Sequence, residues 1–294
     1  MKKHFTYLLV LFLFVQVFNS CSSDDSNTDD TITLPLEETM LLNVSYGNNS
    51  QQVYDVYLPA NRSSDKTKVI VLVHGGGWTG GDKSDMDEFI DLIKLNHPNH
   101  AIVNINYVLA VPPSIPAFPN QFLDLETVIF QLTNLKDDYH ILPEFGLIGT
   151  SAGAHISLMY DYLYDTNDQV KMVCDIVGPT DFTDPFYSDD PLFELLVAAL
   201  IDEDAYPVET NLAEITSPLF HVSSNSSPTI LFYGIEDPLV PISNGDSLDM
   251  ALTNSTVTHS YTMYQGGHGD WSDENLNDLT EQLTSFINTH LPIN

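Results

Sequence analysis

Residues 144–153 read EFGLIGTSAG, and this stretch decides the fold. The short apolar run at 144–148 predicts a buried strand, and residues 152–164 after it have the periodicity of a helix. Ser151 therefore falls on a tight turn between the two, within the pattern Gly-x-Ser-x-Gly. In this pattern the glycines make room for a strained turn that pushes the serine hydroxyl outward. Ser151 is the candidate nucleophile.

The alternation of strand and helix continues on both sides of this turn. Short β-branched runs predict strands at residues 40–45, 53–58, 69–73, 101–107, 144–148, 171–177, 229–233 and 259–264. Longer runs with helical spacing predict helices at 89–95, 122–135, 152–164, 191–201 and 279–291. Such alternation is typical of an α/β fold with a mostly parallel central sheet and helices on both faces. We expect one domain of this kind over residues 36–294.

A glycine-rich segment, His-Gly-Gly-Gly-Trp at residues 74–78, directly follows the apolar strand at 69–73. Acyl transfer places negative charge on a substrate oxygen, and this charge needs N–H donors that are fixed before the reaction. Without Cβ atoms, glycine backbones can come close to a substrate. We assign the N–H groups of Gly76, Gly77 and Ala152 as a candidate oxyanion hole, the last because it opens the helix after Ser151.

Two further side chains complete a candidate triad. A serine hydroxyl needs a histidine to take its proton and a carboxylate to hold that imidazole. In folds with this nucleophile turn, the chain order is serine, acid, histidine. His268 lies in Gly-Gly-His-Gly after the last predicted strand, and Asp237 follows the strand at 229–233. We interpret His268 as the base and Asp237 as the acid.

Other residues compete for these roles. Glu236 is the neighbour of Asp237 and is the alternative acid, although on an extended loop it would point elsewhere. His155 is closest in sequence to Ser151, but it lies on the following helix and outside the expected triad order. We interpret the remaining polar candidates as packing, hydrogen-bonding or turn-forming residues: His74, His155, His221, Asp181 and Asp270.

A long insertion at residues 181–227 separates the sixth and seventh predicted strands. It contains the predicted helix at 191–201 and several aromatic side chains: Phe182, Phe186, Tyr187, Phe193 and Tyr206. Long insertions tend to be functional. We interpret this one as a lid that covers the site and shapes its pocket, and the alternative is a structural excursion that only extends the packing.

The N-terminus predicts export. Lys2 and Lys3 precede an apolar run at 7–18 that is too short to span a bilayer, which is the layout of a signal peptide over residues 1–20. The following cysteine resembles a lipoprotein signal, so we expect lipidation at Cys21 and a flexible tether over 21–35. The alternative is an ordinary secretory peptide. We expect the protein to lie in the bacterial cell envelope as an outer-membrane lipoprotein. It would be exposed on the cell surface if the acidic run after Cys21 is an export tag.

Composition limits the partners. The chain has 41 acidic and 9 basic residues and a formal net charge of −32, which repels nucleic acid and anionic lipid surfaces. We therefore expect no nucleic acid partner, and membrane contact only through the lipid anchor. No metal-ligand spacing and no phosphate loop is present in the sequence, so no cofactor and no metal are expected. Cys174 lies in an apolar run and is interpreted as buried and inert.

The motifs at 74–78, 149–153, 234–237 and 266–269 together resemble those of hormone-sensitive-lipase-like α/β-hydrolases and of the feruloyl and acetylxylan esterases related to them, a BD-FAE-like group of carboxylesterases. The resemblance covers about residues 53–291. It implies the α/β-hydrolase fold and a serine esterase that cleaves small-molecule or glycan-linked carboxylic esters.

Two departures from these relatives narrow the expectation. Val108 follows Tyr107 where many relatives carry arginine, and the segment before the first strand is short for a helical cap. Both favour a carbohydrate esterase or small carboxylesterase over a long-chain lipase. An amidase of the formamidase type with the same triad is the nearest alternative. A non-catalytic, surface glycan-binding lipoprotein is the alternative from a different class.

Overall fold

The computed structural model describes residues 35–189 and 191–293. The predicted signal peptide, Cys21 and nearly all of the predicted tether lie outside the described residues. The remainder forms an eight-stranded sheet with the order β1-β2-β4-β3-β5-β6-β7-β8. The strands are β1 (Thr39–Ser45), β2 (Val53–Leu58), β3 (Val69–Val73), β4 (Ala101–Ile105), β5 (Phe145–Thr150), β6 (Val170–Ile176), β7 (Thr229–Gly234) and β8 (His259–Tyr264). All eight predicted strands are confirmed.

The sheet is mostly parallel, as predicted. β2 runs antiparallel to both of its neighbours, β1 and β4. From β4 to β8 every pairing is parallel. The carboxyl ends of these parallel strands therefore lie at one edge of the sheet, which is where open α/β sheets bind their ligands.

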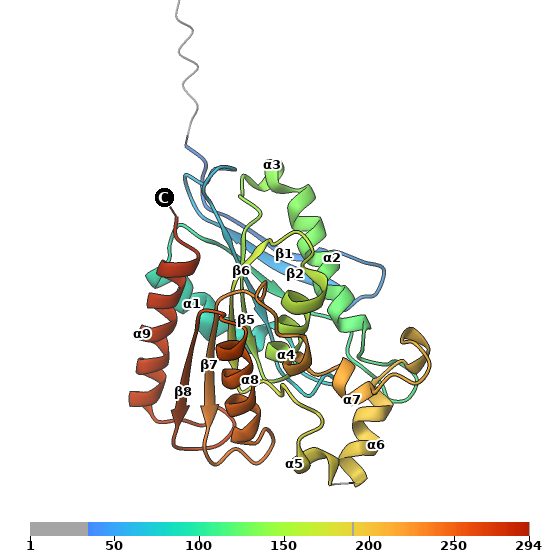
Figure 1. The fold of residues 1–294 in the computed structure, drawn as a ribbon. Coiled ribbons are helices and arrows are strands. Elements are labelled where there is room, and N and C mark those ends of the chain that lie inside the picture. Colours follow the sequence, from blue (N-terminus) through green and yellow to red (C-terminus); the bar gives the residue numbers. More distant parts are fainter. Residues whose placement is uncertain (1–34, 190, 294) are drawn as a thin grey trace, which may run out of the picture. The chain divides into compact units, whose positions relative to one another are not determined.

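Helices cover both faces of the sheet (Figure 1). One face packs under α2 (Asn120–Asn134), α4 (Ala152–Met159) and α8 (Ile242–Asn254), and the other under α1 (Asp87–Asn96) and α9 (Asp273–His290). The short helix α3 (Lys136–Tyr139) follows α2, and residues Tyr160–Tyr164 continue α4 as a π-helix. The helix predicted at 152–164 is thus confirmed.

Strand β3 shows how the sequence builds these two layers. All five of its residues are buried, so both of its faces lie in the core. Val69, Val71 and Val73 join the core cluster on the α2–α4 face, while Ile70 and Leu72 join the cluster on the α1–α9 face. Successive strand residues point to opposite faces. A continuous apolar run is therefore the sequence of a central strand with helices on both sides.

The short helices α3, α5 and α7 were not predicted, and two of the longer helices differ from the predictions. α8 was not predicted, because its buried apolar residues are few and it contains Asn244 and Gly245. α9 begins at Asp273, six residues before the predicted start, with the Ser272 side chain accepting a hydrogen bond from the Asn275 backbone as an N-cap. None of the helices within the described ranges combines the length and hydropathy that a membrane crossing requires.

The insertion at 181–227 carries α5 (Pro185–Ser188), α6 (Pro191–Leu200) and α7 (Leu212–Ile215), drawn in yellow to orange in Figure 1. It is joined to the loop before α2: the backbone N–H groups of Ala117 and Phe118 both donate to the Leu200 carbonyl, and Phe118 forms an isolated bridge with Ile201. The insertion is thus attached to the domain at a defined place.

Candidate active site

Three strand ends bring the predicted triad together. Ser151 directly follows β5, Asp237 lies in the loop after β7, and His268 lies in the loop after β8. His268 Nε2 is 2.8 Å from Ser151 Oγ, and His268 Nδ1 is 2.6 Å from Asp237 Oδ2. The imidazole therefore bridges a hydroxyl and a carboxylate, which is the hydrogen-bond chain that a serine nucleophile requires.

Ser151 occupies a strained turn. Its φ is 51° and its ψ is −119°, a conformation that non-glycine residues rarely adopt. The Ser151 backbone N–H donates to the Ile176 carbonyl at the end of β6, which fixes the turn to the sheet. Gly153 is required for a different reason: a Cβ there would lie 2.1 Å from the Val73 carbonyl oxygen. The motif therefore allows α4 to start directly against β3.

Backbone N–H groups of the same loop fix the orientation of the Asp237 carboxylate. Its side chain is 0% exposed, and its second oxygen, Oδ1, accepts hydrogen bonds from the backbone N–H groups of Leu239 and Val240 at 2.8 and 3.0 Å. Oδ2 is left for His268. Glu236, the adjacent residue on this loop, is exposed to solvent. Of the two carboxylates considered in this loop, the structure brings Asp237 to the histidine.

The glycine-rich loop after β3 presents free backbone donors. Gly76 and Gly77 have φ values of 113° and 56°, which favour glycine. Nothing in residues 35–189 and 191–293 accepts a hydrogen bond from either N–H group. Ala152 is the first residue of α4, so its N–H has no partner within the helix. All three predicted donors remain available for a ligand oxygen.

Buried side chains hold this loop at both ends. The Tyr107 hydroxyl donates to the His74 carbonyl at 2.8 Å. The Gln121 amide, which is fully buried at the start of α2, donates to the Trp78 carbonyl at 2.8 Å. Sequence reasoning did not identify Gln121, because nothing in the sequence relates the first turn of α2 to a carbonyl more than forty residues earlier.

His155 belongs to this supporting layer and lies outside the triad. Its Nδ1 accepts from the Trp78 indole N–H at 3.3 Å, and its Nε2 donates to the Thr216 carbonyl at 2.7 Å. Burial lowers the pKa of His155 to about 4, so the ring is neutral, as this donor–acceptor pattern requires. The interpretation of His155 as a packing residue agrees with these contacts. Asp181 and Asp270 likewise accept hydrogen bonds from nearby backbone N–H groups, those of Thr183 and Gly267.

A buried carboxyl group, that of Asp175, lies on β6 between β5 and β7. Tyr233 Oη on β7 is 2.7 Å from Asp175 Oδ2 on β6 and 2.6 Å from the Gly178 carbonyl oxygen. The Tyr233 hydroxyl has one proton, so it can donate fully to only one of these two oxygens. The Gly178 carbonyl oxygen can only accept, so the hydrogen bond between Tyr233 and Asp175 is best supplied with a proton by the Asp175 carboxyl group. Burial raises the pKa of Asp175 to about 7, in agreement with this proton count. Sequence reasoning did not find this pair.

A comparison with protein families matches residues 54–252 to BD-FAE. The chain belongs to the BD-FAE family. The matched region contains the glycine-rich loop, Ser151 and Asp237, and it ends before His268. The family and the α/β-hydrolase type expected from the motifs are thereby confirmed.

Individual relatives of this BD-FAE protein are distant. It is 23% identical over 242 residues to esterase LipC of Mycobacterium tuberculosis, covering 77% of this chain and 59% of LipC. It is 32% identical over 120 residues to kynurenine formamidase of Salmo salar, covering 40% of this chain and 37% of that enzyme. The chain thus spans about three-fifths of one curated relative and less than half of the other.

A solved structure shows the same fold as this BD-FAE domain. The truncated form of a carbohydrate esterase from gut microbiota superimposes with a TM-score of 0.68 and 20% identity, covering 84% of this chain and 95% of that one. At this identity the likeness concerns the fold, and the arrangement of strands around Ser151 is accordingly that of an α/β-hydrolase.

A pocket of about 380 Å³ opens beside Ser151 in the BD-FAE domain. Its walls come from α1, α9 and the ends of β5 and β6, together with His268 and Gly269. None of the described residues of the insertion lines it. The insertion therefore does not shape this pocket; it contacts the loop before α2 and, through Phe182, Trp78 of the glycine-rich loop, and its role as a lid stays a prediction. A separate pocket of about 530 Å³ lies within the insertion itself.

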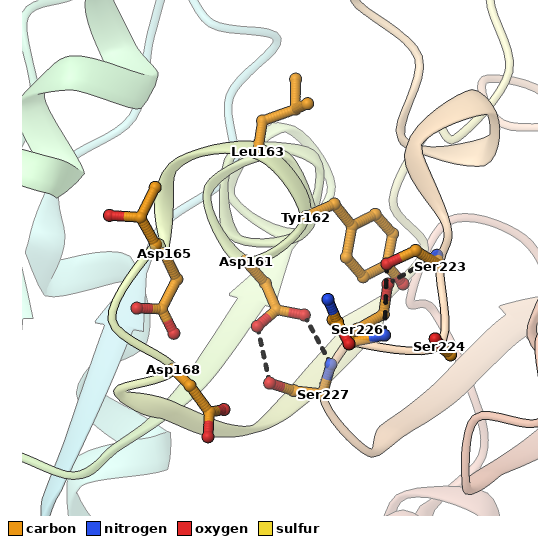
Figure 2. A pocket seen from close by; sticks show the side chains of 11 residues that line it. Asp161, Tyr162, Leu163, Asp165, Asp168, Ser223, Ser224, Ser226 and Ser227 are labelled. Carbon is orange, nitrogen blue, oxygen red and sulfur yellow. Dashed lines mark hydrogen bonds between the residues drawn. The ribbon is translucent and has the colours of Figure 1, made fainter.

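A larger pocket, of about 660 Å³, lies away from the chemistry. Figure 2 shows Asp161 pointing toward Ser227, with Asp165 and Asp168 beside it, at the amino ends of β6 and β7. The Asp161 carboxylate accepts from the Ser227 backbone N–H at 2.9 Å and from the Ser227 hydroxyl at 2.6 Å. These contacts hold the loop before β7 in place, and the triad lies at the opposite ends of the strands.

Proposed function

We propose that this protein is a serine esterase that hydrolyses carboxylic esters through an acyl-enzyme on Ser151. The observation that carries the proposal is the chain of contacts from Asp237 through His268 to Ser151 Oγ, at 2.6 and 2.8 Å, beside three backbone N–H groups that have no partner among the described residues. Similarity to LipC and to the carbohydrate esterase supports the same reaction class.

The first half of the reaction forms the acyl-enzyme. Ser151 Oγ attacks the ester carbonyl carbon while His268 Nε2 takes the hydroxyl proton. The carbonyl oxygen becomes negative and accepts hydrogen bonds from the N–H groups of Gly76, Gly77 and Ala152. Asp237 holds the Nδ1–H tautomer of His268 and stabilises the imidazolium. The tetrahedral intermediate then collapses, His268 gives its proton to the leaving oxygen, and the alcohol departs.

The second half releases the acid. Water takes the place of the alcohol, and His268 Nε2 removes a proton from it as its oxygen attacks the acyl carbon. The same backbone donors stabilise the second oxyanion. Collapse breaks the bond to Ser151 Oγ, which regains its proton from His268. The products are one carboxylic acid and one alcohol.

Amide hydrolysis of the formamidase type is the second candidate. The match to kynurenine formamidase is the specific observation that favours it. The same residues would act on an amide, with His268 protonating the leaving nitrogen, so the triad does not separate the two reactions.

A substrate panel tests the proposal. The protein without residues 1–21 is offered p-nitrophenyl acetate, butyrate and octanoate, acetylated and feruloylated xylo-oligosaccharides, and N-formylkynurenine. We expect p-nitrophenol release to be fastest from the short-chain esters, and a fluorophosphonate probe to add its mass to Ser151. Rapid deformylation without ester hydrolysis would transfer the assignment to the amidase. A folded protein that neither turns over nor is labelled would leave a binding role.

We further propose that the protein is exported and lipid-anchored at Cys21 in the cell envelope. The apolar run at 7–18 after Lys2 and Lys3, with Ser20 before the cysteine, supports this. Metabolic labelling with an alkyne fatty acid should mark the full chain and fail to mark Cys21→Ser. Equal labelling of the two chains would contradict lipidation at this residue.

A further inference from the structure

The pocket beside Ser151 has an apolar wall. Side chains from α1, from β6 and its end, and from α9 and the loop before it supply that wall: Phe89, Leu92, Ile176, Val177, Trp271 and Leu276. Phe89 and Leu92 are half-buried and pack against the core cluster of the α1–α9 face. Trp271 is held in place because its indole N–H donates to the Gly267 carbonyl at 3.1 Å. The wall is therefore preformed.

Few polar groups face this pocket apart from the triad. The Thr280 hydroxyl donates to the Leu276 carbonyl at 2.9 Å, and the Thr150 hydroxyl contacts Met86 Sδ at 3.6 Å. Among the described lining residues, Glu88 is the carboxylate, and it is exposed. A ligand rich in hydroxyl groups would lose its hydrogen bonds to water here without replacing them. An apolar ligand group makes no hydrogen bonds to water and so would lose none on entering the pocket.

The position of the pocket relative to the triad decides which half of an ester it receives. His268 and Gly269 line it, whereas none of the described lining residues comes from the loop at 74–78. The ester carbonyl oxygen must lie at that loop, and the leaving oxygen must lie within reach of His268 Nε2, which protonates it. The group attached to the leaving oxygen therefore has direct access to this pocket.

We propose that this pocket is the leaving-group subsite and that it selects neutral alcohols carrying an apolar or aromatic ring. The inference rests on the proposed ester hydrolysis and adds the class of alcohol to it. A volume of about 380 Å³ accommodates one six-membered ring with its linking methylene. Burying such a ring against Phe89 and Leu92 releases water from apolar surface, which favours the benzyl type of alcohol over methanol.

Isomeric esters test the proposal. Benzyl acetate and methyl phenylacetate have the same atoms, with the phenyl group on the alcohol side in one and on the acyl side in the other, and methyl acetate lacks it. We expect Leu276→Trp, which fills the pocket from its rim, to lower the ratio of kcat/KM for benzyl acetate to that for methyl acetate by roughly ten- to hundredfold. The corresponding ratio for methyl phenylacetate should change less than about twofold.

A second variant acts in the opposite direction. Phe89→Ala widens the pocket, and we expect it to raise kcat/KM for 1-naphthylmethyl acetate relative to benzyl acetate. Leu95→Trp is the matched control, because Leu95 is 80% exposed on the same helix and does not line the pocket. Its ratios should equal those of the wild-type protein.

Each other result overturns the inference in a distinct way. Selective loss of methyl phenylacetate hydrolysis in Leu276→Trp would assign the pocket to the acyl group. Unchanged ratios in both variants would show that neither half of the ester enters it. A wild-type preference for acetylated sugars over benzyl acetate would contradict the class of alcohol. Failure of the wild-type protein on every ester, p-nitrophenyl acetate included, would instead reject the proposed function itself.

Discussion

The Ser151→Ala variant is expected to hydrolyse p-nitrophenyl acetate with a kcat lower than wild type by about 10⁴- to 10⁶-fold. Alanine removes the hydroxyl oxygen that lies 2.8 Å from His268 Nε2, so no acyl-enzyme forms. Residual turnover would come from the oxyanion donors acting on bound ester and water. Stopped-flow and steady-state assays measure the loss, and circular dichroism melting should show a fold at least as stable, because alanine adds no atom to the turn.

Ser285→Ala is the matched control for this variant. Ser285 is exposed on α9, so the same substitution there should change kcat by less than about twofold. If Ser151→Ala keeps more than a hundredth of the wild-type rate at equal protein purity, Ser151 is not the nucleophile and the assignment of the whole triad fails.

The parts of the site that the sequence predicted are those in which local chemistry and chain order leave little choice. Gly153 is required because a Cβ there would lie 2.1 Å from the Val73 carbonyl oxygen, and any chain that turns from β5 into α4 here meets that constraint. Asp237 and His268 follow from the order in which strands return to the same edge of the sheet. Motifs at strand ends, together with the chain order of the triad, are sufficient for such features.

The parts that were missed depend on distant polar contacts. Gln121 reaches the Trp78 carbonyl, and Tyr233 reaches Asp175, across separations that no periodic pattern encodes. α8 escaped prediction because Asn244 is buried and bound to the Thr180 backbone, so a polar residue occupies a core position. The pocket of α1 and α9 was missed for a simpler reason: the predicted start of the last helix, at 279, left Leu276 in a loop.

The second large effect is expected from Asp237→Asn, which should lower kcat by about 10⁴-fold with the backbone geometry retained. The amide oxygen can still accept from Leu239 and Val240 as Asp237 Oδ1 does now. The amide NH₂ group would then face His268 Nδ1 and favour the tautomer that carries its proton on Nε2. That nitrogen could no longer accept the Ser151 proton, and the imidazolium would lose its counter-charge.

Glu236→Gln separates this effect from a general loss of negative charge. Glu236 is the adjacent residue and is exposed, so its neutralisation removes one charge without touching the imidazole. We expect it to change kcat by less than about twofold, because exposed charges are screened by solvent. Fluorophosphonate labelling gives a second readout, since a serine without its proton acceptor reacts slowly: Asp237→Asn should label far more slowly than Glu236→Gln. The reverse order in both assays would make Glu236 the acid. The loop after β7 would then have to rearrange so that the exposed Glu236 carboxylate replaces the Asp237 carboxylate, which two backbone N–H groups already hold.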